Sequence, residues 1–176
     1  MTGHPPSAFS SVRSESADEA LEELDDIVEQ HRIRHRAEDA QAAGVEHGRR
    51  AFMDCFDYLC ATQVRPAMVA AVDRLRSDGA DGVIAVHPGG EPRFRHPSIV
   101  LWMSLEGEVA EPYREDRCPY LRLEADIGRR CVQVWQGDMW EGSGTSGPLG
   151  DWDLSEITST RVEQAIVEVL RRAEAT

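Results

Sequence analysis

The chain has 176 residues, with 32 acidic against 19 basic side chains and a formal net charge of -13. This length suits one compact domain, and a hydrophobic content of 41% argues against global disorder. The excess of acid excludes nucleic acid as the default partner and disfavours anionic membrane surfaces. Every basic residue is an arginine, and lysine and asparagine are absent, which indicates the coding bias of a GC-rich, bacterial genome.

The sequence carries no signal for export. Residues 1–13 lack the apolar run of a secretory signal, and no stretch approaches the ~18 apolar residues of a membrane span. The cysteines form no Cys-x-x-Cys pair, which favours free thiols in a reducing cytosol over disulfides or zinc. We therefore expect a cytoplasmic protein without a cofactor. The cysteines are Cys55, Cys60, Cys118 and Cys131.

The N-terminal quarter of the chain is predicted to be a tail followed by a helix. Residues 1–16 are rich in Ser and Pro, show no periodicity and predict a disordered tail. Ser16 precedes Glu19 by three residues, which is the spacing of a capping box. Acids crowd the first turns as far as Asp26, and Arg32 opens a short basic stretch behind them. This pattern predicts a helical arm over residues 17–48.

Heptad spacing in the arm predicts a surface that pairs with another helix. Counting from Leu21 places Leu21 and Val28 at a positions and Leu24 at a d position. The apolar phase continues beyond a polar centre, so we expect either one long helix or two nearly collinear helices. Gly44 and Gly48 mark the place where a break would fall. We expect Leu21, Leu24 and Val28 to contact a partner or a second copy.

Residues 49–176 are predicted to form an α+β core domain. A helix over 49–62 is expected to kink or restart at Pro66, because proline lacks an amide donor and crowds the preceding turn. The helix then ends near Gly79. Alternation with period two predicts strands, and a final helix covers 158–173. The expected strands are Gly82–His87, Ser98–Leu105, Tyr120–Ala125 and Cys131–Gln136.

This element order predicts a three- to four-stranded antiparallel meander with the C-terminal helix packed on one sheet face. Residues 137–153 are expected to be irregular. A small acidic α+β domain with flanking helices is similar in outline to bacterial secretion chaperones, which bind protein segments without chemistry. Such an outline is an analogy of fold only.

Two patterns could carry chemistry. His31 and His35 share a helix face, and Glu38 could add an oxygen ligand to a metal, but Arg32 stands where a zinc protease has its glutamate. Residues 142–147 match Gly-x-Gly-x-x-Gly, yet no helix follows at once, so a plain Gly/Ser loop is favoured over a dinucleotide site. His87 and His96 are candidate bases and Cys118 a candidate nucleophile, without a recognised signature around them.

Aromatic residues give the most specific functional prediction. Trp102 and Trp135 alternate with aliphatic residues on their strands and should lie on the sheet face away from the helices. Together with Tyr120, Trp140 and Trp152, they could form an exposed aromatic patch at an interface. The other interpretation is that the Gly-rich segment folds back and buries them.

The sequence thus favours a non-enzymatic protein-interaction module, adaptor- or chaperone-like, that pairs through its N-terminal helix. The partner would be another protein or a second copy, not nucleic acid or a membrane. The alternative is a small-ligand- or metal-binding enzyme with a pocket between the sheet and the 137–153 segment. Its polar groups would be His87, His96 or the His31/His35 pair.

Overall fold

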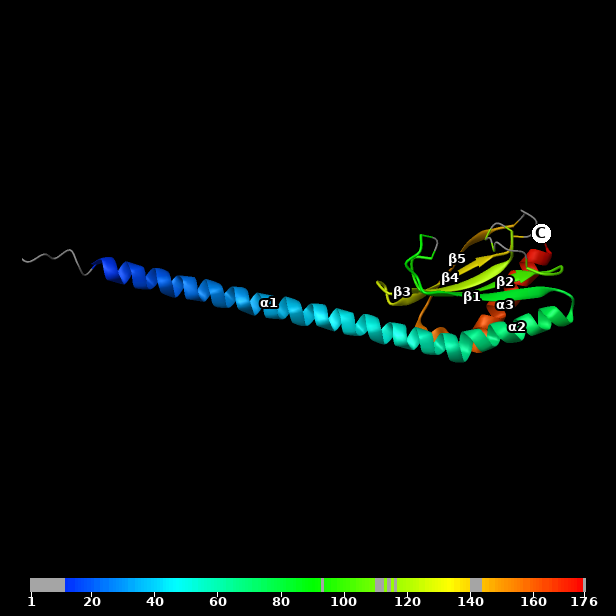
Figure 1. Cartoon of the computed structure of the whole chain (residues 1–176), viewed down its shortest axis with the longest axis horizontal. Helices are drawn as coiled ribbons and strands as arrows, with labels where there is room; N and C mark the ends of the chain where they lie inside the picture. Colours follow the sequence, from blue (N-terminus) through cyan, green and yellow to red (C-terminus); the bar gives the residue numbers. More distant parts are fainter. Residues whose placement is uncertain are drawn as a thin grey trace, which may run out of the picture. The chain divides into compact units, whose positions relative to one another are not determined.

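The computed structural model describes residues 12–92, 94–109, 113, 115, 117–139 and 144–175, with side chains from Ile27 onward (Figure 1). The chain divides into two compact units, Met1–His47 and Gly48–Thr176. The fold class is α+β as predicted, with a long N-terminal helix, an antiparallel sheet and a C-terminal helix. None of the described helices carries an apolar stretch of the length that crossing a bilayer requires.

Helix α1 runs without a break from Val12 to Leu59. The question of one helix or two is therefore answered in favour of one, in spite of Gly44 and Gly48, each of which costs about 1 kcal/mol relative to alanine. The helix begins ahead of the Ser16 capping box, so residues 12–16 of the predicted tail are helical. The rest of that tail, residues 1–11, lies outside the described residues.

A π-helical segment, Cys60–Val64, joins α1 to α2, Arg65–Ser77. Pro66 lies in the first turn of α2, where its missing N–H costs least. The wide π turn absorbs the crowding that the proline ring imposes on the turn before it. The restart predicted at Pro66 is confirmed.

The sheet is a meander in which spatial order equals chain order. All strand pairs are antiparallel. The first four strands lie within one residue of their predicted bounds, because alternation of aliphatic and other residues marks them clearly. The strands are β1 Asp81–His87, β2 Ser98–Ser104, β3 Tyr120–Asp126, β4 Cys131–Gly137 and β5 Ser146–Trp152.

The expectation of three to four strands is wrong by one strand, β5, which lies in the segment predicted to be irregular. Gly147, Pro148 and Gly150 are poor strand formers, and they hide the strand from a sequence pattern. They are tolerated because β5 lies at the sheet edge and pairs only with β4. The register shifts between Val134 and Trp135, which is a bulge opposite the proline.

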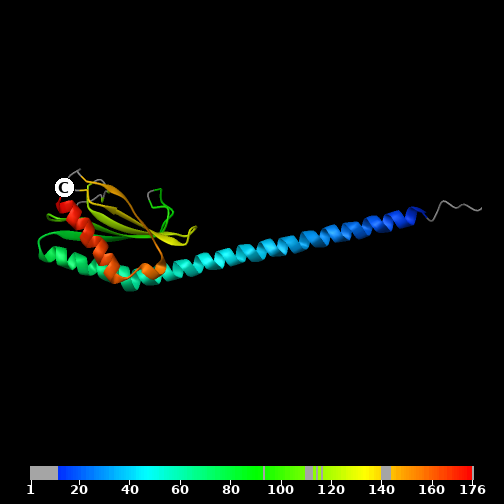
Figure 2. The same cartoon turned by 180° about the vertical axis from the view of Figure 1, so that it is seen from behind.

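Helices α2 and α3, Ser159–Glu174, lie on the same face of the sheet (Figures 1 and 2). A short 3-10 helix, Leu154–Glu156, leads into α3. The start of α3 is joined to the π segment, since the Ser159 hydroxyl donates to the Gln63 carbonyl at 3.1 Å. The core between helices and sheet consists of the aliphatic sides of the strands and the inner faces of the helices. Fully buried members include Leu101, Met103, Leu121, Leu123, Val132, Val134, Met68, Val64, Val162 and Val169.

The opposite face of the sheet is also covered. A second cluster of buried side chains forms there under the segments that precede β2 and β3. Phe94 comes from the first segment and Val109 from the second, and both are less than 10% exposed. The sheet is therefore an inner layer between helices on one side and loops on the other.

Candidate functional site

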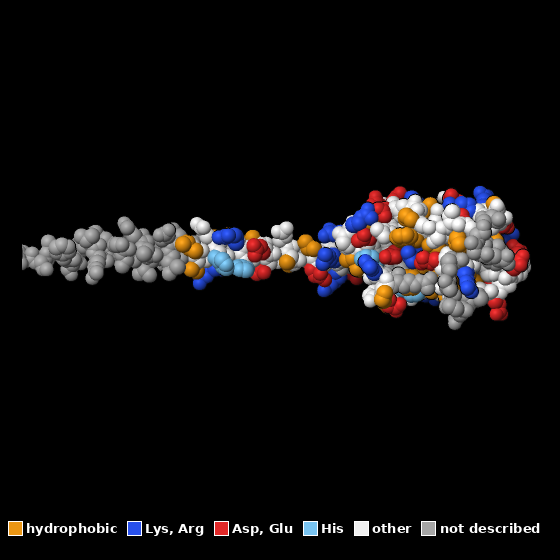
Figure 3. All heavy atoms as spheres, turned by 90° about the horizontal axis from the view of Figure 1, so that it is seen from above, with side chains coloured by type: hydrophobic (Ala, Val, Ile, Leu, Met, Phe, Trp, Pro, Cys, Tyr) orange, Lys and Arg blue, Asp and Glu red, His pale blue; other side chains and the backbone are white. Residues whose placement is uncertain are grey.

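The described part of the helical arm exposes every side chain. Residues 27–47 are all exposed, and the exposed fractions of Ile27 and Ile33 are 56% and 57%. Figure 3 shows apolar, basic, acidic and histidine side chains together at the surface of this segment. Of the predicted contact residues, Val28 is 41% exposed, whereas the side chains of Leu21 and Leu24 lie outside the described residues.

The histidine pair of the arm lies edge to face, with ring centroids of His31 and His35 4.6 Å apart. Glu38 Oε2 lies 3.7 Å from His35 Nδ1, and both side chains are largely exposed. Within the described part of the chain, no three His, Cys, Asp or Glu side chains gather as a metal site requires. The arrangement supplies an exposed ion pair when the imidazole is protonated.

The predicted exposed aromatic patch is wrong for Trp102 and Tyr120. Trp102 points away from the helices, as alternation predicts, yet it is only 2% exposed and Tyr120 only 1%. The two rings pack on each other with centroids 5.3 Å apart, and Tyr113 stacks on Trp102 at 6.1 Å. Strand alternation gives the face of a side chain but not what covers that face, which here is the loop before β3.

The two other tryptophans that the structure describes, Trp135 and Trp152, do not form an exposed patch either. Trp152 is 5% exposed and belongs to the core on the helix side, with the Arg161 guanidinium 4.4 Å above its ring. Trp135 is half-buried on the loop-covered face. Trp140 lies outside the described residues.

A buried arginine organises the loop-covered face, and sequence analysis missed it. Arg122 is 7% exposed, and its Nη1 donates to Glu115 Oε1 at 2.7 Å while its Nε lies 3.3 Å from Glu124 Oε2. Its guanidinium also lies over the rings of Phe94 and Trp135, at 5.7 and 5.0 Å from their centroids. A buried charge needs such partners, and here they fix the loops to the sheet. Among 19 arginines, nothing in the sequence singled this one out.

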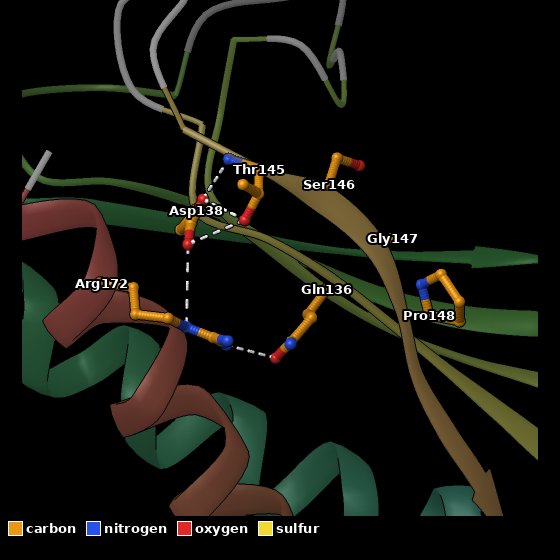
Figure 4. Close-up of a pocket in the computed structure, with 7 residues that line it drawn as sticks. All are labelled: Gln136, Asp138, Thr145, Ser146, Gly147, Pro148 and Arg172. Carbon is orange, nitrogen blue, oxygen red and sulfur yellow. Dashed lines mark hydrogen bonds and ion pairs between the residues drawn. The ribbon is translucent and has the colours of Figure 1, made fainter.

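A polar pocket of about 160 Å³ is lined in part by residues of the 137–153 segment (Figure 4). It opens between β4, β5 and the last turn of α3. Its lining is almost entirely polar, unlike the apolar pockets that hold most small ligands. The lining residues are Gln136, Asp138, Thr145, Ser146, Gly147, Pro148 and Arg172.

The polar groups of this pocket bond one another. The Asp138 carboxylate accepts the Thr145 N–H at 2.5 Å and the Thr145 hydroxyl at 3.1 Å. Arg172 Nε lies 3.7 Å from Asp138 Oδ2, and Arg172 Nη2 donates to the Gln136 amide oxygen. Gly144 has φ +119°, and a Cβ there would lie 2.7 Å from the Asp138 carbonyl oxygen. The network links β5 to α3, and within it the Asp138 carboxylate and the Arg172 guanidinium compensate each other's charge. Its role is therefore structural.

The glycine-rich motif does not form a phosphate loop in its described part. Residues 144 and 145 lead directly into β5, and the next helical turn begins only at Leu154. A dinucleotide site needs the motif to open a helix, whose N-terminus then binds the pyrophosphate. Residues 142 and 143 lie outside the described residues. The described part of the motif, residues 144–147, therefore leads into β5 and forms its first two residues.

An apolar cavity of about 370 Å³ lies between the end of α1 and the paired ends of β1 and β2. Burial and the nearby Asp57 carboxylate raise the pKa of the Cys60 thiol to about 12. This thiol stays protonated near neutral pH and is a poor nucleophile. His87, a predicted base, stacks on Phe94 with ring centroids 3.5 Å apart. The lining consists of Met53, Phe56, Asp57, Cys60, Val86, His87, Pro88, Pro97, Ser98 and Ile99.

Comparison with known proteins identifies no relative. No protein-family model matches the chain, and neither does any curated protein or solved structure. The similarity in outline to secretion chaperones therefore rests only on the general outline of a small acidic α+β domain with flanking helices. Function has to be inferred from the residues themselves.

Proposed function

We propose that the chain is a non-enzymatic, cytoplasmic bacterial interaction module, adaptor- or chaperone-like, whose helical arm pairs with the arm of a second copy. The observation that carries this proposal is the exposure of every described side chain over residues 27–47 within one continuous α-helix. Most helical stability in proteins comes from packing of an amphipathic face rather than from intrinsic propensity. Pairing with another helix supplies that packing.

The order of charges along the arm favours an antiparallel second copy. Acids dominate residues 18–29, and Arg32, Arg34 and Arg36 follow. Two parallel copies in register would place acids beside acids. Antiparallel copies bring the acidic stretch of one arm beside the arginines of the other, which lowers the repulsion and fixes the orientation.

The heptad positions predict which residues form the seam, the line of contact between the two paired arms. Val28 falls at an a position and Val45 at a d position, and each is 41% exposed. Ile33 falls at an f position, opposite the seam, and is more exposed at 57%. These residues form a matched set, because all are apolar, exposed and on the same helix.

The test compares Val28→Glu with Ile33→Glu in the full chain by amide hydrogen exchange of residues 27–47 at increasing protein concentration. The unsubstituted arm should gain protection with concentration, since pairing is bimolecular. Val28→Glu should need at least about tenfold more protein for the same protection, a loss of about 1.4 kcal/mol. Ile33→Glu should behave like the unsubstituted chain. Protection that does not depend on concentration, or equal effects of both substitutions, would refute the pairing.

Metal analysis separates this function from the alternative of a metal- or ligand-binding enzyme. Stoichiometric zinc or iron in the purified protein would favour the enzyme. The polar pocket lends that alternative little support, because Asp138 and Arg172 compensate each other's charge there.

A further inference from the structure

The strand β1 forms an edge of the sheet and, among the residues that the structure describes, its centre lacks the features that protect such edges. It pairs only with β2, and its central residues, Gly82 to Val86, contain no charge and no proline. Natural sheets protect an edge with charged residues, proline, bulges or a covering segment, because open main-chain groups pair with other strands. A seven-residue edge strand whose five central residues carry no charge is a ready pairing surface.

The other edge of the same sheet is protected. Strand β5 carries Pro148, which has no N–H to donate, and glycines on either side of it. The register also shifts between Val134 and Trp135, which twists this edge away from regular pairing. The two edges therefore differ in the property that decides whether a strand can be added.

The hydrogen-bond register shows which main-chain groups of β1 are open. Met103 donates its N–H to the Pro119 carbonyl, beside β3, so the odd-numbered residues of β2 bond β3 and the even-numbered ones bond β1. The β1 residues opposite those even-numbered β2 positions make the main-chain hydrogen bonds between β1 and β2. The main-chain groups that remain face the edge, and they belong to Gly82, Ile84 and Val86.

A side chain covers only the first of these groups in the described part of the chain. Arg76 Nη2 donates to the Gly82 carbonyl at 3.3 Å, and that oxygen keeps a second lone pair. No hydrogen bond from a described residue outside the sheet reaches the main chain of Ile84 or Val86. The centre and the end of the edge are open.

Apolar side chains flank this edge on the helix side. Val86 is 63% exposed. Val69 of α2 is 42% exposed and shares a helix face with Val72 and Arg76, at spacings of three and seven. Those two residues lie against β1, since Arg76 Nε donates to Asp81 Oδ1 at 2.7 Å and Val72 packs over Gly82. Apolar surface thus borders the open main-chain groups.

We propose that two copies of the chain join through antiparallel pairing of β1 with β1 about a two-fold axis at Ile84, which makes one continuous sheet. The occupant is a second copy because the strand is complementary to itself in this register. Val86 then lies opposite Gly82 of the second copy, beside the Val72 side chain that packs over that glycine, and Asp81 lies opposite the His87 imidazole. The Val69 side chains of the two α2 helices border the seam. This interface is independent of the arm.

The first experiment is disulfide cross-linking of the full chain with the exposed Cys55 replaced by alanine. Ile84→Cys places two thiols opposite each other, with Cα atoms about 5.5 Å apart, within the range a disulfide spans. Val86→Cys is the matched control. Val86 is far more exposed than Ile84, but in the proposed pairing it lies opposite Gly82 of the second copy and not opposite Val86 of that copy. Under mild oxidation, Ile84→Cys should give at least about tenfold more covalent dimer. Equal yields from both, or no dimer from a folded Ile84→Cys chain, would overturn the proposal.

The second experiment adds a charge to the edge and follows both mass and exchange. Val86→Lys should raise the dissociation constant measured by sedimentation at least about tenfold and remove the protection of residues 82–86. Val167→Lys on α3, where the side chain is 44% exposed, should change neither. If the arms alone join the copies, Val86→Lys leaves the mass unchanged and the proposal fails. Protected edge amides in a monomeric chain would mean that another segment covers β1, which also overturns it.

Discussion

Replacing Trp102 with alanine should destabilise the core domain strongly, although this residue lies on the sheet face away from the helices. Its side chain is 2% exposed and packs between Tyr120 on the neighbouring strand and Tyr113 in the covering loop. Removing the indole leaves a cavity between sheet and loop, because the strand cannot move without breaking its ladder to β1 and β3.

The size of the effect follows from the burial. A tryptophan buries about 150–250 Å², and at about 25 cal/mol per Å² the transfer contribution is about 4–6 kcal/mol. An alanine side chain retains a small part of this transfer free energy, and the loop relaxes partly into the cavity. The loss of unfolding free energy should therefore be about 3–5 kcal/mol. For a chain of this size, that lowers the Tm by about 6–20 °C.

The assay is urea unfolding followed by far-UV circular dichroism, with a thermal scan in parallel. Trp102→Phe should recover more than half of the loss, since an aromatic ring still fills the space. Val167→Ala, at an exposed position of α3, should stay within about 0.5 kcal/mol of the unsubstituted chain. A Tm for Trp102→Ala within about 2 °C of the unsubstituted value would show that the loops leave this face open and that burial there stabilises little.

The polar pocket and the apolar cavity give further expectations. Asp138→Ala should cost about 1–3 kcal/mol, because it leaves the Thr145 N–H without its acceptor and removes one carboxylate from beside Arg172, and hydrogen exchange at Thr145 and along β5 should quicken. Asp138→Asn keeps an acceptor for Thr145 and should cost less. Cys60 should resist iodoacetamide at about pH 8 while exposed Cys55 reacts, because a pKa of about 12 leaves almost no thiolate; peptide mass spectrometry reads both sites. Equal labelling of the two in the folded chain would contradict this.

Most of the secondary structure could be predicted from the sequence because periodicity is a local signal. Aliphatic alternation from Ile99 to Met103 marks β2 without reference to anything distant. Strand β5 could not be predicted in this way. Its glycines and Pro148 belong to an edge, where pairing with β4 rather than intrinsic preference makes the strand. The continuity of α1 through Gly44 and Gly48 is likewise decided by the neighbouring turns and not by the glycines.

The candidate sites were harder to predict because they depend on residues far apart in the sequence. Alternation placed Trp102 on the correct face, but only the position of the loop before β3 shows that it is buried. Asp138 pairs with Arg172 at the far end of α3, and Arg122 pairs with Glu115, which is only seven residues away but lies in a segment without periodicity. The open edge of β1 depends on strand order, which composition does not contain.

The meander has a consequence for how the chain folds. Each strand pairs with its neighbour in sequence, so the sheet can grow hairpin by hairpin with short loop closures and a low contact order for a β structure. The contact that docks α3 is long-range in the sequence, because Ser159 at the start of α3 hydrogen-bonds Gln63, 96 residues earlier. All five strands precede α3 in the chain, so during synthesis they leave the ribosome before α3 can cover the apolar face. The nascent chain therefore passes through a stage in which only α2 covers the apolar face of the sheet, and the part of the core that α3 will bury is exposed to water.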